Sequence, residues 1–384
     1  MDSRQPMTRQ TRLPALLALS AVLVTGALRA ADDPIRIGEY ASLTGKEATF
    51  GQSSHKGITM AIEQLNAAGG VLGRSLELTT EDNQTVPGQS ATAAKILISR
   101  DKVIALLGEV SSGRSLEAAP IAQAARVPMI APAATNPKVT QVGSYIFRVC
   151  FIDPFQGTVM AKFAAGELKA RRVAIISSVS NAYSVGLAKF FREKFTADGG
   201  EIPIEQKYSE GDKDFRAQLT AIKAEGCDAV FVPGYYTEAA LIVRQARELG
   251  MTMPFLGGDG WVSDELLDIG GDAMNGCYYS THFSPADSSP AARKFVADYK
   301  ARWDGDTPDA FAALGYDAVG MLADAIRRAG TTDEPKLRDA LAATKDYSGA
   351  TGLTTMDANR DATKPATIIA IRDGKLNFLE TVAP

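Results

Sequence analysis

The chain has 384 residues, enough for two or three domains, so a peptide or a disulfide-bonded miniprotein is excluded. Apolar residues make up 45% and charged residues 22%, which is typical of a globular protein and not of a disordered or polytopic membrane protein. The formal net charge of -4 offers no basic surplus for phosphates, so we expect no nucleic-acid partner. Three scattered Cys and two His predict neither a disulfide framework nor a metal site.

The first part of the chain, residues 1–30, has the pattern of an export signal. Several Arg precede an apolar run over 13–28, and small residues follow near Ala30. A single membrane anchor is the alternative, but this run is shorter than the ~20 residues that span a bilayer. We therefore expect a secretory signal peptide over 1–30 and a mature protein in the periplasm.

Short apolar runs then alternate with segments of helical period. The strand-like runs are IRIGEYASL (35–43), SLELTTED (75–82), VIALLGEV (103–110) and PMIAPAA (128–134). Helices are predicted through GITMAIEQLNAAGG, SATAAKILISR and LEAAPIAQAAR, which follow the first three. Continuously apolar strands are typical of a parallel sheet that is covered on both faces.

The same alternation begins again at residue 171. The runs are RRVAIISSV (171–179), IPIEQKY (202–208), DAVFVPGY (228–235), PFLGGDG (254–260) and GCYYSTHF (276–283). Between them we predict helices over 183–198, 214–225 and 237–249. The pattern therefore predicts an α/β protein with two doubly wound sheets and no flexible linker between them.

The last hundred residues begin with helices and end with strands. Helical periodicity predicts helices over 290–303, 309–329 and 334–344, the second with a buried packing face. The tail alternates polar and apolar residues around the turn-forming residues 372–375, which indicates a terminal hairpin.

No motif nominates a catalytic group. The sequence contains neither the glycine-rich motifs that bind phosphates nor the G-x-S-x-G motif of a nucleophilic serine. An S-x-x-K match at 53–56 lacks its companion motifs. Asp357 opens a pattern like a calcium loop, but Ala362 and Ile368 replace the required glycine and glutamate. We therefore expect no enzyme, no metal and no cofactor.

Two loops of the first half follow predicted strands and carry hydroxyl groups. Ligands of doubly wound sheets bind at the carboxyl ends of the strands. The loops 107–113 and 131–137 bring Ser and Thr hydroxyls and free backbone N–H groups to that edge, a pattern that favours an anion. A plainer alternative is that Ser111 or Ser112 is only a helix N-cap.

Two loops of the second half carry the complementary chemistry. Residues 234–236 bring two phenols, and residues 257–260 place the carboxylate of Asp259 among glycines. Glycines let a ligand approach the backbone, and a carboxylate attracts a cation. The two halves together therefore favour a small zwitterion as the ligand.

At these residues the chain resembles the leucine/isoleucine/valine-binding proteins, the periplasmic receptors of branched-chain amino-acid ABC transporters. The matching stretches are IGEYASLTGKEATFGQSSHKGITMAIEQLNAAGGVLGRSLEL, the SSG and APAATNP loops, GYYTEAALIVRQARELG and PFLGGDG. The resemblance implies a type I periplasmic binding fold, with two flavodoxin-like lobes joined by three hinge crossings near residues 152, 284 and 364. Lobe 1 would comprise 31–152 and 284–363, and lobe 2 would comprise 153–283 and 364–384.

The resemblance also implies roles for eight residues. Ser112 and the backbone of Thr135 would bind the α-carboxylate, and the Ala133 carbonyl would also face the polar end of the ligand. Asp259 would face the α-ammonium, with Tyr235 at the same end. The walls of the side-chain pocket would be Phe50, Tyr183 and Phe311.

Three positions depart from the family pattern. Asp259 stands where the family commonly has Glu, which keeps the charge but shortens the side chain. Trp261 could enlarge or fill the pocket. A disulfide of some members is absent, because Ser111 and a residue near Gln84 occupy its expected positions.

The function that the resemblance implies is that of a monomeric receptor without chemistry of its own. It would bind a small amino acid, branched-chain or otherwise aliphatic, in the cleft between the lobes by hinge closure. It would then deliver this ligand to the permease subunits of a membrane ABC transporter. The alternative is that the same fold binds another small solute, such as an amide, urea or an aromatic acid, for uptake or sensing.

Overall fold

The computed structural model describes residues 1–5 and 33–384. The chain divides into the units Met1–Asp32 and Asp33–Pro384, and the second contains every helix and strand described below. From residue 6 onward the predicted signal peptide lies outside the described residues. Among the described residues, no helix has the length and apolar character that a membrane crossing requires.

Five parallel strands form the first sheet in the order β2-β1-β3-β4-β5. The strands are β1 Ile35–Ala41, β2 Leu76–Asp82, β3 Ala105–Leu107, β4 Met129–Ala131 and β5 Ile146–Arg148. The helices between and after them are α1 Ala48–Ala67, α2 Gln89–Ser99, α3 Ser112–Ala125 and α4 Lys138–Gln141. The three inner strands are buried almost throughout, which explains why their sequences are apolar without alternation.

Seven strands form the second sheet in the order β15-β14-β10-β9-β8-β6-β7. They are β6 Val173–Ser178, β7 Glu205–Tyr208, β8 Ala229–Phe231, β9 Phe255–Gly257, β10 Tyr278–Thr281, β14 Ala366–Arg372 and β15 Lys375–Val382. The accompanying helices are α5 Asp153–Gly166, α6 Ala182–Ala197, α7 Arg216–Ala224, α8 Tyr236–Glu248 and α9 Glu265–Gly270, with 3-10 turns η1 Asp259–Trp261 and η2 Gly271–Met274. The predicted terminal hairpin is confirmed, since β14 and β15 pair antiparallel around the turn.

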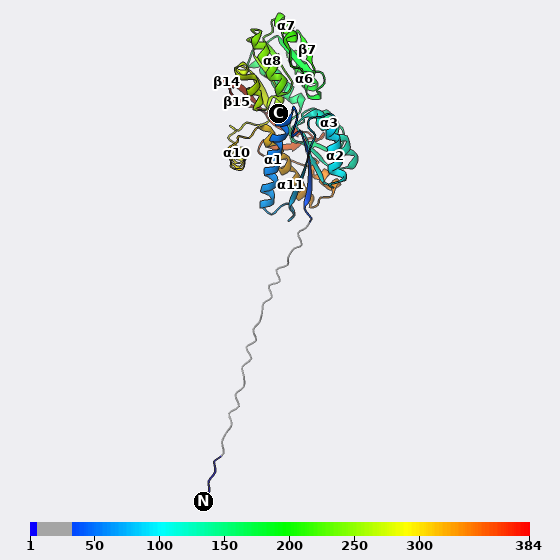
Figure 1. Ribbon diagram of the computed structural model, residues 1–384, viewed down its shortest axis with the longest axis vertical. Helices are drawn as coiled ribbons and strands as arrows, with labels where there is room; N and C mark the ends of the chain where they lie inside the picture. Colours follow the sequence, from blue (N-terminus) through cyan, green and yellow to red (C-terminus); the bar gives the residue numbers. More distant parts are fainter. Residues whose placement is uncertain (6–32) are drawn as a thin grey trace. The chain divides into compact units, whose positions relative to one another are not determined.

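Three further helices return to the first sheet. They are α10 Pro290–Arg302, α11 Ala310–Ala329 and α12 Glu334–Ala342, and α11 packs along α1 (Figure 1). Gly57 of α1 and Gly315 of α11 make this close packing possible, because a Cβ atom on either would collide with the backbone of the facing helix. The contact brings two distant parts of the sequence, near residues 50 and 311, to the same place.

The predicted α/β fold class is confirmed, and the six helices that were predicted with explicit bounds begin and end within two residues of those bounds. The prediction omitted α5 and the short elements α4, α9, η1 and η2. It also omitted a small antiparallel sheet of β11 Tyr347–Gly349, β12 Gly352–Met356 and β13 Ala362–Thr363. Buried Asp361 of the loop before β13 ties this segment to β5 by an ion pair with Arg148 (Nε–Oδ1, 2.7 Å).

The described chain passes between the two sheets three times. It leaves the first sheet after β5, returns to it after β10, and enters the second sheet again at β14. The lobe boundaries near residues 152, 284 and 364 stay a prediction.

Candidate functional site

A small cavity of about 10 Å³ lies where loops from the carboxyl ends of both sheets meet. Its lining residues are Phe50, Val110, Ser112, Ala133, Thr135, Tyr183, Tyr235, Asp259, Gly260 and Phe311. All eight residues named from the sequence are among them, together with Val110 and Gly260. The structure therefore brings these residues together around one space, and their ligand-binding roles stay predictions.

The first sheet contributes a helix N-terminus to the cavity. Ser112 is the first residue of α3, and its hydroxyl accepts a hydrogen bond from the backbone N–H of Asn136 (3.2 Å). The N-cap residue is Ser111, but its hydroxyl makes no capping bond and instead lies 2.9 Å from the hydroxyl of Tyr235. Ser111 is therefore the N-cap by its backbone position, but its side chain does not cap the helix. Free N–H groups and the helix dipole favour an anion at this point.

The loop after β4 holds Ala133 and Thr135 in a fixed conformation. Arg148, fully buried on β5, donates hydrogen bonds to the carbonyls of Ala134 and Asn136, the second at 2.9 Å. The buried hydroxyl of Thr135 has no hydrogen-bond partner among the described residues. Because an unsatisfied buried hydroxyl is costly, this group is suited to bind a polar ligand atom.

The second sheet contributes a buried carboxylate. Asp259 opens η1 after β9 and is only 3% exposed. Its Oδ1 accepts a hydrogen bond from Nε2 of Gln156 (2.9 Å), and its Oδ2 lies 3.0 Å from Nε2 of His282. Gln156 comes from α5 and His282 follows β10, so three elements fix the orientation of this carboxylate.

His282 packs against the ring of Phe151, with centroids 3.7 Å apart, and burial lowers its pKa. A neutral imidazole whose Nε2 carries the proton donates to the carboxylate without cancelling its charge. This contact and the hydrogen bond from Gln156 hold the carboxylate of Asp259 at the wall of the cavity.

A second carboxyl group lies close to this arrangement. Asp153 is fully buried in the first turn of α5, and neither of its oxygens has a hydrogen-bond partner among the described residues. Burial, with the charge of Asp259 adding to it, raises the pKa of Asp153 to about 8. At neutral pH the carboxyl group of Asp153 is therefore mostly protonated.

Aromatic rings from both sheets form the rest of the wall. Phe50 of α1 makes edge-to-face contacts with Phe311 of α11 (centroids 4.9 Å apart) and with Tyr235 (5.2 Å). Tyr183 of α6 stacks on Tyr235 at 5.4 Å, and its hydroxyl accepts a hydrogen bond from the backbone N–H of Gly260 (3.1 Å). The cavity thus has an apolar aromatic side and a polar side, which matches the expected division between side chain and polar end of a small ligand.

The structure corrects the expectation for Trp261. Its side chain is fully buried, its Nε1 donates to the carbonyl of Val232 (3.0 Å), and its ring covers Gly257. Trp261 packs inside the second sheet layer and is not a wall of the cavity, so it neither enlarges nor fills the pocket.

Sequence reasoning missed Gln156 and His282. The pair Asp153-Pro154 is a typical helix start and could have indicated α5, which carries Gln156. A single His after a strand gave no comparable signal. Among the described residues no cluster of His, Cys, Asp and Glu could hold a metal ion, and Cys150, Cys227 and Cys277 are free and buried.

Comparison with known proteins gives a consistent result. The sequence model of a family described as periplasmic binding protein matches residues 34–375. The leucine-, isoleucine-, valine-, threonine-, and alanine-binding protein of Pseudomonas aeruginosa is 32% identical over 333 residues, which are 86% of this chain and 88% of that protein.

Two solved structures are similar over nearly their whole length. A leucine-binding protein of Thermotoga maritima MSB8 is 42% identical with a TM-score of 0.88, and the match covers 91% of this chain and 99% of that one. A branched-chain amino acid transporter substrate-binding protein of Streptococcus pneumoniae, solved in complex with isoleucine, is 35% identical with a TM-score of 0.87 and covers 91% and 100%.

Proposed function

This chain belongs to the periplasmic binding protein family, and from that membership we propose that it is the substrate-binding receptor of an ABC transporter for a small amino acid. The ligand is a branched-chain or other aliphatic amino acid. Two similar proteins, a leucine-binding protein and a relative solved in complex with isoleucine, support this class of ligand.

One observation supports the proposal: the cavity combines hydroxyl groups and a helix N-terminus from one sheet with a carboxylate from the other. Ser112 and Thr135 come from the first sheet, and Asp259 comes from the second. A ligand that is negative at one end and positive at the other satisfies both. The aromatic rings of Phe50, Phe311 and Tyr183 would then surround its apolar side chain.

In this proposal, the parts built on the two sheets move as two lobes. Lobe 1 comprises 31–152 and 284–363, and lobe 2 comprises 153–283 and 364–384. The ligand first docks on lobe 1 through its carboxylate, and closure at the three crossings brings Asp259 and Tyr235 over it. Because each charged end is held by a different lobe, the ligand itself stabilises the closed form.

The biological setting follows from the same proposal. The protein is exported through the signal peptide at 1–30 and works in the periplasm as a monomer. It releases its ligand unchanged to the permease subunits of the transporter, without a catalytic step.

A thermal-shift screen tests the proposed ligand class. The purified protein is heated with each of the twenty amino acids and with a panel of amides, urea and aromatic acids. A ligand at a hundred times its dissociation constant adds about 2.7 kcal/mol to the free energy of unfolding, so one or more aliphatic amino acids should raise the melting temperature. A shift with an amide, urea or an aromatic acid, and with no amino acid, would overturn the proposal and favour the alternative solute class.

A further inference from the structure

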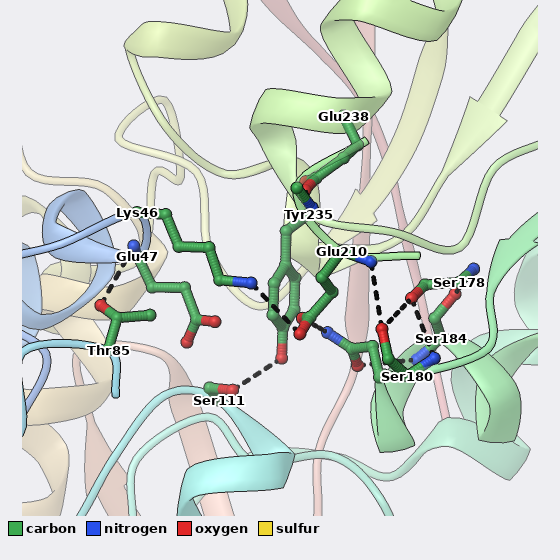
Figure 2. Close-up of polar contacts among 12 residues, drawn as sticks. Lys46, Glu47, Thr85, Ser111, Ser178, Ser180, Ser184, Glu210, Tyr235 and Glu238 are labelled. Atoms are coloured by element: carbon green, nitrogen blue, oxygen red, sulfur yellow. Dashed lines mark hydrogen bonds and ion pairs between the residues drawn. The ribbon is translucent and has the colours of Figure 1, made fainter. Parts of the chain in front are cut away.

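A second cavity adjoins the first, and Tyr235 belongs to the walls of both. Its other walls come from both sheets: Lys46 and Glu47 precede α1, and residues 210–213 follow β7. Across this space the ammonium group of Lys46 lies 3.2 Å from Oε2 of Glu210, as Figure 2 shows. We propose that Lys46 and Glu210 form a latch that holds the two lobes together and slows ligand release without touching the ligand. The effect of this latch on ligand release rests on the proposed function, whereas its effect on lobe closure does not.

Glu210 is held in place by its own lobe. Its second carboxylate oxygen, Oε1, accepts a hydrogen bond from Nδ2 of Asn181 (2.7 Å), and its backbone N–H donates to the hydroxyl of Ser180 (3.0 Å). Asn181 also caps α6, because its Oδ1 accepts from the backbone N–H of Ser184 (3.1 Å). Tyr183 in the first turn of this helix lines the ligand cavity, so the latch and the binding site share one helix end.

Lys46 belongs to lobe 1, and its backbone contacts lobe 2 across the cleft. Its carbonyl accepts a hydrogen bond from the hydroxyl of Tyr236 (2.8 Å), the neighbour of Tyr235. The next residue, Glu47, is 2% exposed and has a carboxylate oxygen without a partner among the described residues. Burial, with the charge of Glu210 adding to it, raises the pKa of Glu47 to about 7. Phe50 of the ligand cavity follows one helical turn later.

The effect of an ion pair on closure depends on whether its two residues belong to the same lobe or to different lobes. An ion pair inside one lobe contributes to the stability of that lobe in the open and the closed form alike. Lys46 and Glu210 belong to different sheets, so their pair exists only when the lobes are together. Its free energy therefore acts on the equilibrium between the open and the closed form.

The expected effect is modest, because the side chains of Lys46 and Glu210 are 41% and 20% exposed. Partly exposed ion pairs of this kind change an equilibrium by about 1.5- to 5-fold. Lys46→Met and Glu210→Gln should each lower the ratio of closed to open molecules by such a factor. The double variant should lower it no further than either single variant does, since both remove the same pair.

The experiment measures the distance between spin labels on exposed Lys95 of α2 and exposed Thr220 of α7, without added ligand. It compares the wild type, both single variants and the double variant. Lys194→Met is the matched control, because the pair of Lys194 with Asp198 (2.7 Å) lies at one end of α6 within a single lobe. The control should leave the distance distribution unchanged, while the latch variants shift it towards the longer, open distance. Unchanged distributions, or additive shifts in the double variant, would overturn the latch.

A second measurement joins the latch to the ligand. With leucine, the dissociation rate constant should rise 1.5- to 5-fold in Lys46→Met and Glu210→Gln, with the association rate constant nearly unchanged. High salt should weaken closure of the wild type and have less effect on the variants. If no amino acid binds the wild type, the proposed function fails, but the label distances still decide whether the latch exists.

Discussion

At the scale of single residues, the proposed function makes binding of the ligand's ammonium group depend on Asp259. We expect Asp259→Asn to remove the charge while its amide oxygen still accepts the hydrogen bond from Gln156. Its NH2 group can donate to His282 only in the neutral tautomer whose Nε2 carries no proton. Leaving a sequestered ammonium without its counter-charge costs about 3–5 kcal/mol, or roughly two to three and a half decades of affinity. Titration calorimetry measures this loss. Asp264→Asn, at an exposed position nearby, is the control and should bind as the wild type does. Equal affinities of the two variants would contradict the assignment.

Asp153 predicts a dependence of stability on pH. In the unfolded chain an Asp titrates near about 3.9, whereas burial raises the pKa of Asp153 to about 8. Between these values the folded protein holds a proton that the unfolded chain has released. The free energy of unfolding should therefore fall as pH rises through this window, by at most about 1.4 kcal/mol per pH unit.

The variant Asp153→Asn carries no titrating group at this position. Its free energy of unfolding, from urea titrations at several pH values between 5 and 8, should fall less steeply than that of the wild type and should exceed it at pH 8. Asp264→Asn should keep the slope of the wild type. Identical slopes for the wild type and Asp153→Asn would show that Asp153 is not the proton-holding group.

The polar loops of the cavity, 107–113, 131–137, 234–236 and 257–260, could be named from the sequence because each follows a predicted strand. The walls Phe50, Tyr183 and Phe311 were named only through the resemblance to a known family. The hydrogen-bond partners of the cavity residues could not be named. The hydrogen bond from Gln156 to Asp259 joins residues 103 positions apart, and no spacing in the sequence encodes it. Local chemistry was visible, whereas the network that orients the carboxylate depends on tertiary contacts.

At the scale of elements, the packing of α1 on α11 places two walls of the cavity. We expect Gly57→Ala to push these helices apart, because the new Cβ would collide with the carbonyl of Ala312. Overpacking of this kind costs about 1–3 kcal/mol of unfolding free energy, and it should also weaken binding by displacing Phe50 from Phe311. Urea unfolding and calorimetry measure the two effects.

The matched control is Gly166→Ala at the end of α5, where no atom lies within 4 Å of the added Cβ. This change should leave stability unchanged or slightly raised, since alanine is the better helix former. If both variants have the stability of the wild type, the close helix contact does not position the cavity walls.

Elements with a clear local pattern were predicted, and elements without one were missed. Strands such as β6 and helices such as α8 follow directly from apolar runs and helical periodicity. The buried residues of α5 extend around much of the helix, from Gln156 and Gly157 to Phe163 and Ala164, so its periodicity is weak. The short sheet of β11, β12 and β13 depends on pairing between strands of two to five residues, which has little signal in the sequence.

At the scale of the whole molecule, the proposed hinge closure uses the three passages of the chain between the sheets, about which one sheet layer would rotate against the other. Contacts across the cleft include the edge-to-face packing of Phe50 on Tyr235 and hydrogen bonds. Two of these bonds are the one from Asn136 Nδ2 to the carbonyl of Ala182 (2.7 Å) and the contact of the Ser111 and Tyr235 hydroxyls (2.9 Å). Hydrogen bonds of this kind contribute about 0.5–1.5 kcal/mol each, so they can be exchanged with water without a large barrier. A ligand that bridges both sheets can therefore shift the equilibrium between the two forms.

Small-angle X-ray scattering tests this shift. On addition of a saturating aliphatic amino acid, the radius of gyration of the wild type should decrease, because binding at both charged ends favours the closed form. The same concentration should leave the radius of gyration of Asp259→Asn unchanged, because residue 259 then has no carboxylate to bind the ligand's ammonium group. A wild type that binds the amino acid with no change in its radius of gyration would contradict hinge closure while leaving the ligand class intact. The two parts of the mechanism, recognition of a zwitterion and closure over it, can in this way be judged separately.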